Sequence, residues 1–216
     1  MVASEAAFAD VAVLLAEVGR QCYARGWALG TSGNFSAVVQ REPLRLAITP
    51  SGVDKGQLTA EQIVQIDPGG RVVRGSGAAS AEASLHVAIV RVRQAGAVLH
   101  THSIWSTLLS DASAAEGGLV LEGYEMLKGL EGVHTHEHRE WLPILDNAQD
   151  WAGSAPLVEQ MLTQHADAHG FLLRGHGLYT WGRDLAEAKR HVEVLEFLLE
   201  VTGRKRGHHG ERENPR

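Results

Sequence analysis

The sequence contains very little cysteine. Cys22 is the only cysteine among 216 residues. A single thiol can form neither an intramolecular disulfide nor a cluster of thiolate ligands for zinc. Any metal site in this chain must therefore be built from histidine and carboxylate side chains, and we expect a reducing, cytoplasmic location.

Long apolar runs and an excess of positive charge are also missing. No stretch approaches the roughly 20 apolar residues that cross a membrane, and the N-terminus lacks a basic segment followed by an apolar run. We therefore expect neither export nor a membrane partner. The formal net charge is −6, which argues against a broad basic surface for nucleic acid. With 44% hydrophobic and 21% charged residues, the chain is typical of one globular domain.

Nucleotide-binding signatures are absent as well, because neither GxGxxG nor GxxxxGK[ST] occurs in the sequence, so no nucleotide cofactor is required. Apolar spacing predicts a mixture of helices and short hairpins, which indicates an α/β or α+β layered domain. The last helix is predicted to end near Glu200. Residues 203–216 are charged and poor in apolar side chains, so we expect a mobile tail after a body of residues 1–202.

Histidines at a strand end are the most informative feature that is present. His100 and His102 follow the apolar run 97–99, and alternate residues of a strand project from one face. Two imidazoles on one face can bind a metal ion, although a strand cap and an ordinary half-buried histidine explain the pair as well. His176, between two glycines in a turn, is the best candidate for a third ligand. A surface hairpin is the alternative for that turn.

A second alternating cluster comprises His134, His136 and His138. Its spacing suits a metal equally well, but no apolar strand precedes it. We therefore interpret it as a solvated surface loop.

Two glutamates could transfer protons beside such a metal. Glu82 lies in the first turn of a helix that Ser80 is predicted to cap, and a capping role alone would explain it. Glu125 lies in segment 122–130, which we expect to be helical. A metal that polarises a carbonyl or hydroxyl, together with either glutamate as base and acid, suits carbanion or enediolate chemistry.

Five motifs in this order resemble the zinc-dependent class II aldolase family over residues 6–202. They are Gly30-Thr31-Ser32-Gly33-Asn34-Phe35-Ser36, Thr49-Pro50-Ser51-Gly52, Ser80-Ala81-Glu82, His100-Thr101-His102 and Arg174-Gly175-His176-Gly177. The resemblance implies a single-domain, three-layer α/β/α sandwich with a central mixed, largely antiparallel sheet. It also implies a homotetramer that acts on a sugar phosphate.

The resemblance assigns roles residue by residue. It implies one Zn²⁺ per subunit, held by His100, His102 and His176, and the cluster around His136 is not among the family's ligands. Glu82 matches the catalytic glutamate of the aldolases, whereas Glu125 matches the acid/base of animal dehydratases, so the proton carrier stays open between them. The substrate phosphate is expected at Asn34, Ser51, Gly52 and Ser80, with Lys55 nearby.

Segments 122–130 and 141–147 are most similar to the dehydratase branch of the family. This implies dehydration of 5-methylthioribulose-1-phosphate to 2,3-diketo-5-methylthiopentyl-1-phosphate in methionine salvage. A sugar-phosphate aldolase or 4-epimerase is the alternative within the family. A non-catalytic zinc-binding scaffold is an alternative from another class, and the complete histidine set and phosphate loops argue against it.

Overall fold

The computed structural model describes the backbone of residues 2–212 and the side chains of residues 7–207. Its α-helices are Val2–Ala24 (α1), Ala83–Arg93 (α2), Ile104–Ala112 (α3), Trp151–Gln164 (α4) and Leu185–Arg212 (α5). Its strands are Asn34–Arg41 (β1), Leu44–Ile48 (β2), Val64–Ile66 (β3), Val72–Arg74 (β4), Ala97–Thr101 (β5), Gly118–Glu122 (β6), Arg139–Leu145 (β7), Gly170–Leu173 (β8) and Gly177–Gly182 (β9).

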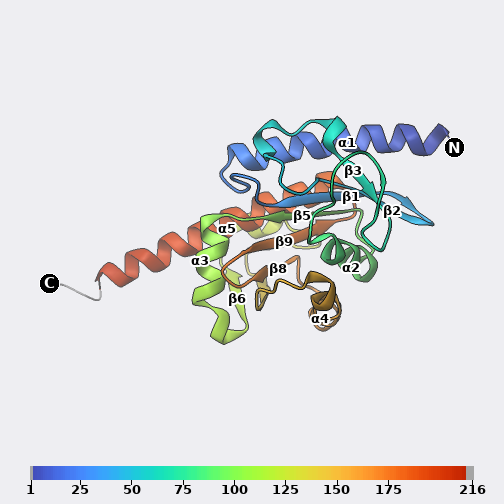
Figure 1. The fold of residues 1–216 in the computed structure, drawn as a ribbon. Helices are drawn as coiled ribbons and strands as arrows, with labels where there is room; N and C mark the ends of the chain where they lie inside the picture. The colour runs from blue at the N-terminus through green and yellow to red at the C-terminus, as the bar shows by residue number, and fades with distance from the viewer. Residues whose placement is uncertain (1, 213–216) are drawn as a thin grey trace.

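The strands form one mixed sheet in the order β4-β3-β2-β1-β5-β9-β8-β7-β6 (Figure 1). Only β7 and β8 pair in parallel within the described residues, and the other neighbours are antiparallel. Strand β5 lies in the interior of the sheet between β1 and β9. All five of its residues are buried, as expected for a strand covered on both faces.

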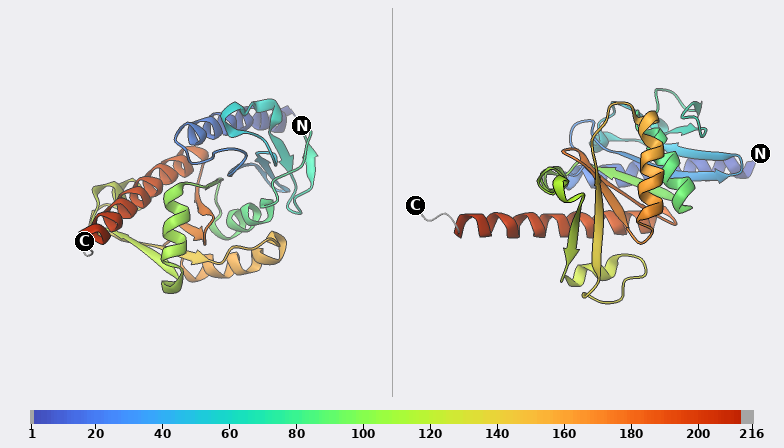
Figure 2. Two further views of the ribbon diagram at one scale, coloured as in Figure 1. Left: turned by 60° about the vertical axis from the view of Figure 1, so that its left-hand side comes forward. Right: turned by 90° about the horizontal axis from the view of Figure 1, so that it is seen from below.

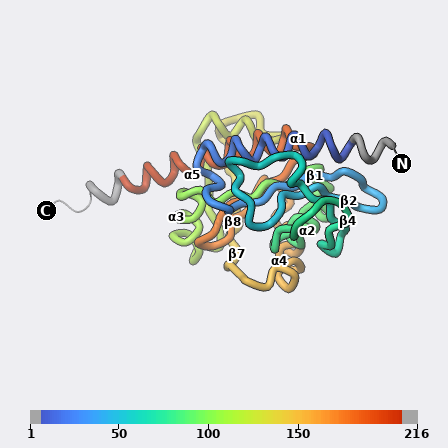
Figure 3. Tube along the Cα trace, turned by 45° about the horizontal axis from the view of Figure 1, so that its top comes forward, coloured from blue at the N-terminus to red at the C-terminus, as the bar shows by residue number. Residues whose placement is uncertain are grey.

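Helices cover both faces of this sheet (Figure 2). Helices α1 and α5 contribute apolar residues to one core, which includes Leu15 and Leu195. Helices α2 and α4 pack against each other and bury Ile89 and Leu162 in a second core on the other face. The tube view shows the same division, with α1 and α5 apart from α2 and α4 (Figure 3). The predicted three-layer α/β/α sandwich with a largely antiparallel sheet is confirmed.

Two predicted elements differ from the structure. Segment 122–130 forms only the short 3₁₀ helix Glu125–Gly129 (η4), because Gly123 adopts a positive φ of 80° that ends strand β6 in a turn. The last helix does not end near Glu200 but continues to Arg212. The backbone of Gly203 packs so closely on the Trp105 ring that a Cβ would overlap it.

This continuation affects the predicted tail, since residues 203–212 extend α5 and residues 213–216 lie outside the described part of the chain. The division at residue 202 stays a prediction. Among the described residues, no helix combines the length and apolar character needed to cross a bilayer.

Candidate active site

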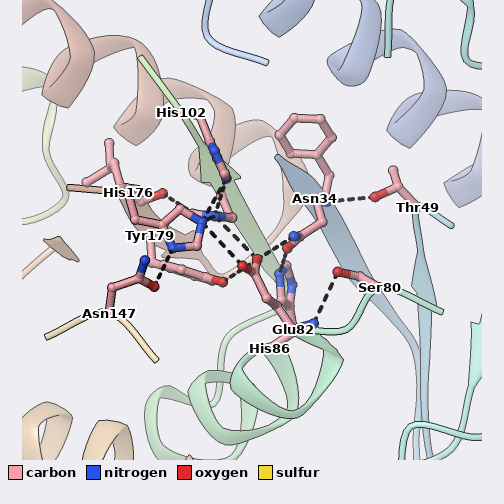
Figure 4. Close-up of polar contacts among 12 residues, drawn as sticks. Asn34, Thr49, Ser80, Glu82, His86, His102, Asn147, His176 and Tyr179 are labelled. Atoms are coloured by element: carbon pink, nitrogen blue, oxygen red, sulfur yellow. Dashed lines mark hydrogen bonds and ion pairs between the residues drawn. The ribbon is translucent and has the colours of Figure 1, made fainter. Parts of the chain in front are cut away.

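Three adjacent strands place three polar side chains in one row. In the register of the sheet, Asn34 on β1 lies opposite His100 on β5, and His100 lies opposite Tyr179 on β9. Residues that face each other across neighbouring strands project from the same face. Helix α2 begins beside this row with Glu82 as its N-cap residue. The Glu82 side chain points toward Asn34, Tyr179 and the histidines (Figure 4).

The structure brings the predicted histidines together. His100 is the last residue but one of the buried strand β5, His102 follows the strand, and His176 lies in the turn between β8 and β9. The Nε2 atoms are 2.8 Å apart for His100 and His102, 3.1 Å for His102 and His176, and 3.3 Å for His100 and His176. Gly177 allows this approach because a Cβ there would overlap the Thr101 carbonyl oxygen.

Hydrogen bonds to Nδ1 of His100 and His176 determine that Nε2 of each ring faces the cluster. Nδ1 of His100 lies 2.9 Å from the Leu178 carbonyl oxygen, and Nδ1 of His176 lies 3.1 Å from Oδ1 of Asn147. Both partners are acceptors, so each Nδ1 carries the proton and each Nε2 presents a lone pair. Lone pairs at this separation repel unless a cation lies between them. The donor set therefore fits a metal ion, with second contacts of the kind that orient histidine ligands.

The electrostatics also favour neutral imidazoles. Burial, together with the neighbouring imidazoles, holds the pKa of His100 well below its usual range. Burial is also the main reason that the pKa of His102 falls to about 3, with His176 and Lys55 contributing. The pKa of His176 is lowered by burial, against the opposing charge of Glu82. Neutral imidazole is the form that binds a metal.

Glu82 lies directly beside this cluster. Its Oε2 is 3.3 Å from His100 Nε2, and its Oε1 is 3.3 Å from His176 Nε2. Asn34 Nδ2 and the Tyr179 hydroxyl donate to Oε2 at 2.6 and 2.7 Å (Figure 4). The residue is 8% exposed, so its carboxylate is held in place while remaining open to the site.

The residues predicted to hold phosphate line one cavity of about 160 Å³, and Glu82 and His102 line it as well. These residues are Asn34, Ser51, Gly52, Lys55 and Ser80. Lys55 is 1% exposed and donates to the carbonyl oxygens of Thr31 and Val53, so it links the two loops. Burial lowers its pKa to about 8. The amide of Asn34 points to Glu82, not freely into the cavity.

Glu125 lies on η4 with its side chain 68% exposed, where it pairs with Lys128 and His136. The pKa of Glu125 is lowered, mainly by its hydrogen bond and charge interaction with Lys128. Its contacts in one chain are therefore with neighbours on the surface and not with the triad. The structure of a single chain brings Glu82, but not Glu125, to the histidines.

The alternating histidines 134, 136 and 138 do not act together. His134 and His136 are exposed, whereas His138 donates to the buried carboxylate of Glu140 at 2.9 Å. His169 Nδ1 lies 2.9 Å from the same oxygen, and His169 Nε2 lies 2.8 Å from the Glu131 carbonyl oxygen. His138, Glu140 and His169 are close enough to hold a metal. However, the Glu140 carboxylate already accepts hydrogen bonds from both imidazoles. In the cluster of His100, His102 and His176, by contrast, lone pairs converge.

Sequence reasoning missed Tyr179, His86 and Asn147. Tyr179 stacks on His100 with ring centroids 3.9 Å apart, and His86 contacts Asn34 from α2. The alternation of β9 could have placed Tyr179 on the inward face, because it lies next to the GHG turn. Contacts of His86 and Asn147 depend on how distant elements pack, which no local pattern reports.

The sequence is similar to those of known proteins over most of its length. The profile of the Class II Aldolase and Adducin N-terminal domain matches residues 13–202. Methylthioribulose-1-phosphate dehydratase from Marinobacter nauticus is 43% identical over 194 residues, which cover 89% of this chain and 92% of that protein. The enzyme of the same name from Hahella chejuensis is 45% identical over 184 residues, covering 85% and 88%.

A solved structure shows the same fold. L-fuculose-1-phosphate aldolase from Thermus thermophilus superposes with a TM-score of 0.71 at 26% identity, covering 96% of this chain and 97% of that one.

Proposed function

The chain belongs to the class II aldolase and adducin family. We propose that it dehydrates 5-methylthioribulose-1-phosphate to 2,3-diketo-5-methylthiopentyl-1-phosphate, a step of methionine salvage. It is an enzyme of the lyase class. The observation that carries the proposal is the convergence of three imidazole nitrogens and the Glu82 carboxylate beside the cavity lined by the two loops.

His100, His102 and His176 would hold the metal, which we propose to be one Zn²⁺ per subunit. Nitrogen ligands with an open fourth position suit catalytic zinc. Held there, zinc would supply Lewis-acid polarisation of the ketose oxygens, which would make the C3 hydrogen more acidic. Ser51, Gly52 and Ser80 would bind the phosphate.

The protein's own groups then move the protons. Dehydration breaks the C3–H bond and the C4–OH bond. A carboxylate accepts the C3 proton, the C4 hydroxyl leaves with a proton as water, and the enol settles to the 2,3-diketone. Glu82 is the carboxylate that one chain places beside the triad, at 3.3 Å from two of its nitrogens. Glu125 stays a candidate that requires a neighbouring subunit.

We also propose that the enzyme is a cytoplasmic homotetramer. Cys22 is buried and unpaired, which suits a reducing compartment. Ile104 and Leu108 on α3 are 68% and 55% exposed, and exposed apolar side chains on one helix suit a contact with a second copy of the chain. Light scattering during gel filtration measures the assembly, and a monomer, with the chain mass of 23.3 kDa, would contradict the tetramer.

Activity assays with two substrates test the proposed function. Purified protein loaded with zinc should release the diketone from 5-methylthioribulose-1-phosphate and should leave fuculose-1-phosphate intact. Cleavage of fuculose-1-phosphate without dehydration of the first substrate would assign the chain to the aldolases instead.

A further inference from the structure

A chain of buried polar groups reaches Glu82 from inside the protein. Ser36 Oγ lies 2.7 Å from His86 Nδ1, His86 Nε2 contacts Asn34 Oδ1, and Asn34 Nδ2 lies 2.6 Å from Glu82 Oε2. Ser36 and His86 are 0% exposed, so neither can touch the substrate. Figure 4 shows the part of this chain that runs from His86 through Asn34 to Glu82, beside the imidazoles.

The carboxylate determines the direction of every bond in this chain. An ionised carboxylate only accepts hydrogen bonds, so the Asn34 NH₂ group must face Glu82 and its Oδ1 must face His86. Because Oδ1 is also only an acceptor, the proton of His86 must be on Nε2. Nδ1 of His86 then accepts from the Ser36 hydroxyl. Burial lowers the pKa of His86 to about 3, so the ring keeps one proton and stays neutral.

The other tautomer of His86 would set two acceptors against each other. With the His86 proton on Nδ1, the bare Nε2 would accept from the Asn34 NH₂ group, and Oδ1 would turn toward Glu82. Two acceptor oxygens would then face each other, which is unfavourable. The tautomer of His86 therefore determines which end of the Asn34 amide faces Glu82.

We propose that His86 is a positioning residue: through Asn34 it holds the Glu82 carboxylate in the orientation in which it faces the histidine triad. The Nε2 proton of His86 keeps the Asn34 NH₂ group on Glu82, where the Tyr179 hydroxyl supplies a second donor at 2.7 Å. This inference rests on the proposed function for its kinetic consequences only.

Two substitutions separate this role from packing. In His86→Gln, the side-chain amide nitrogen can occupy the place of Nε2 and donate to Asn34. In His86→Asn, the shorter amide reproduces the place of Nδ1 and cannot reach Asn34. We expect His86→Asn to lower kcat about 10- to 100-fold, as for outer residues that orient a metal site, with KM and bound zinc close to wild type. His86→Gln should recover most of the lost kcat.

The kinetic result overturns the proposal if His86→Asn keeps the wild-type kcat, or if both variants lose kcat equally. Thermal unfolding of both variants serves as the control for folding. A structural role alone would lower the melting temperature and the zinc content together with kcat.

A second measurement does not depend on turnover. In protein with ¹⁵N-labelled histidine, the His86 ring signal, identified by its loss in His86→Gln, should show a neutral ring protonated on Nε2. Protonation on Nδ1 contradicts the proposal even if His86→Asn fails to fold. If wild-type protein does not dehydrate the substrate, the proposed function fails, and the ring signal still decides the role of His86.

Discussion

Replacing Glu82 by glutamine tests which carboxylate carries the proton. Glutamine has almost the same shape, and its side-chain oxygen can keep the hydrogen bonds from Asn34 and Tyr179 that Glu82 Oε2 accepts at 2.6 and 2.7 Å. The change therefore removes the base with little effect on the fold. The variant for comparison is Glu125→Gln, at the other candidate carboxylate, which is 68% exposed.

The size of the effect follows from the loss of general acid–base catalysis. Such a group contributes about 10²- to 10⁴-fold, which equals about 2.7–5.4 kcal/mol of barrier at about 1.36 kcal/mol for each factor of ten. We expect kcat of Glu82→Gln to fall within this range while zinc remains bound. Steady-state kinetics with metal analysis of the same samples measures both. A variant that retains more than about a tenth of the wild-type kcat, a loss below the lower end of that range, would refute the role of Glu82.

Three further predictions follow from the structure. Mixed oligomers of Glu125→Gln and His100→Ala subunits should regain activity if Glu125 acts across a subunit boundary. Mixtures of Glu82→Gln and His100→Ala subunits should not regain it, because Glu82 and His100 belong to the site of one chain. Equal recovery of activity in both mixtures would contradict this. Gly177→Ala should lower the free energy of unfolding by about 1–3 kcal/mol, because the new Cβ overpacks against Thr101, and it should weaken zinc binding. Gly207→Ala is the control, since its Cβ meets open space, and it should have neither effect. Denaturant unfolding compares the stability of the two variants. Glu140→Gln should lower the free energy of unfolding by roughly 1–3 kcal/mol, because it weakens the buried contacts of His138 and His169. This loss of stability should depend on pH.

The pH dependence follows from two opposite shifts. Burial alone would raise the pKa of Glu140, but its hydrogen bonds and the charge of His169 lower it below 4.5. Burial would lower the pKa of His169, but Glu140 and the Glu131 carbonyl raise it above 6.5. The Glu140 contribution is present above 4.5 and is lost as pH falls through its folded pKa. The His169 contribution is present below 6.5 and is lost as pH rises through its folded pKa. The difference between wild type and Glu140→Gln should therefore be largest between pH 4.5 and 6.5, and a difference independent of pH would contradict the pairing.

Local patterns predicted the parts of the site that lie on single segments. The alternation of His100 and His102 follows from the geometry of one strand, and the glycines beside His176 mark a close approach of two strands. The contacts of Glu82 could not be predicted in this way. Its partner Tyr179 is 97 positions away in the chain, and Ser36 and His86 are 50 apart, so these contacts depend on how α2 packs on the sheet.

The two errors in the fold have a similar origin. Segment 122–130 has a helical pattern of apolar residues, but a glycine turn and packing against α5 reduce it to η4. The residues after Glu200 are polar, and polar composition alone indicates a tail. Their helix is stabilised by Trp105, whose ring contacts Gly203 and lies under the Arg204 guanidinium. Tertiary contacts outweighed local sequence in both places.

The most direct test is a single-turnover assay of the zinc-loaded enzyme with 5-methylthioribulose-1-phosphate labelled with deuterium at C3. The wild-type protein should lose the label as it forms the 2,3-diketone, and His100→Ala protein should do neither. Formation of the diketone at the wild-type rate by His100→Ala protein, or no reaction by the zinc-loaded wild type, would contradict it.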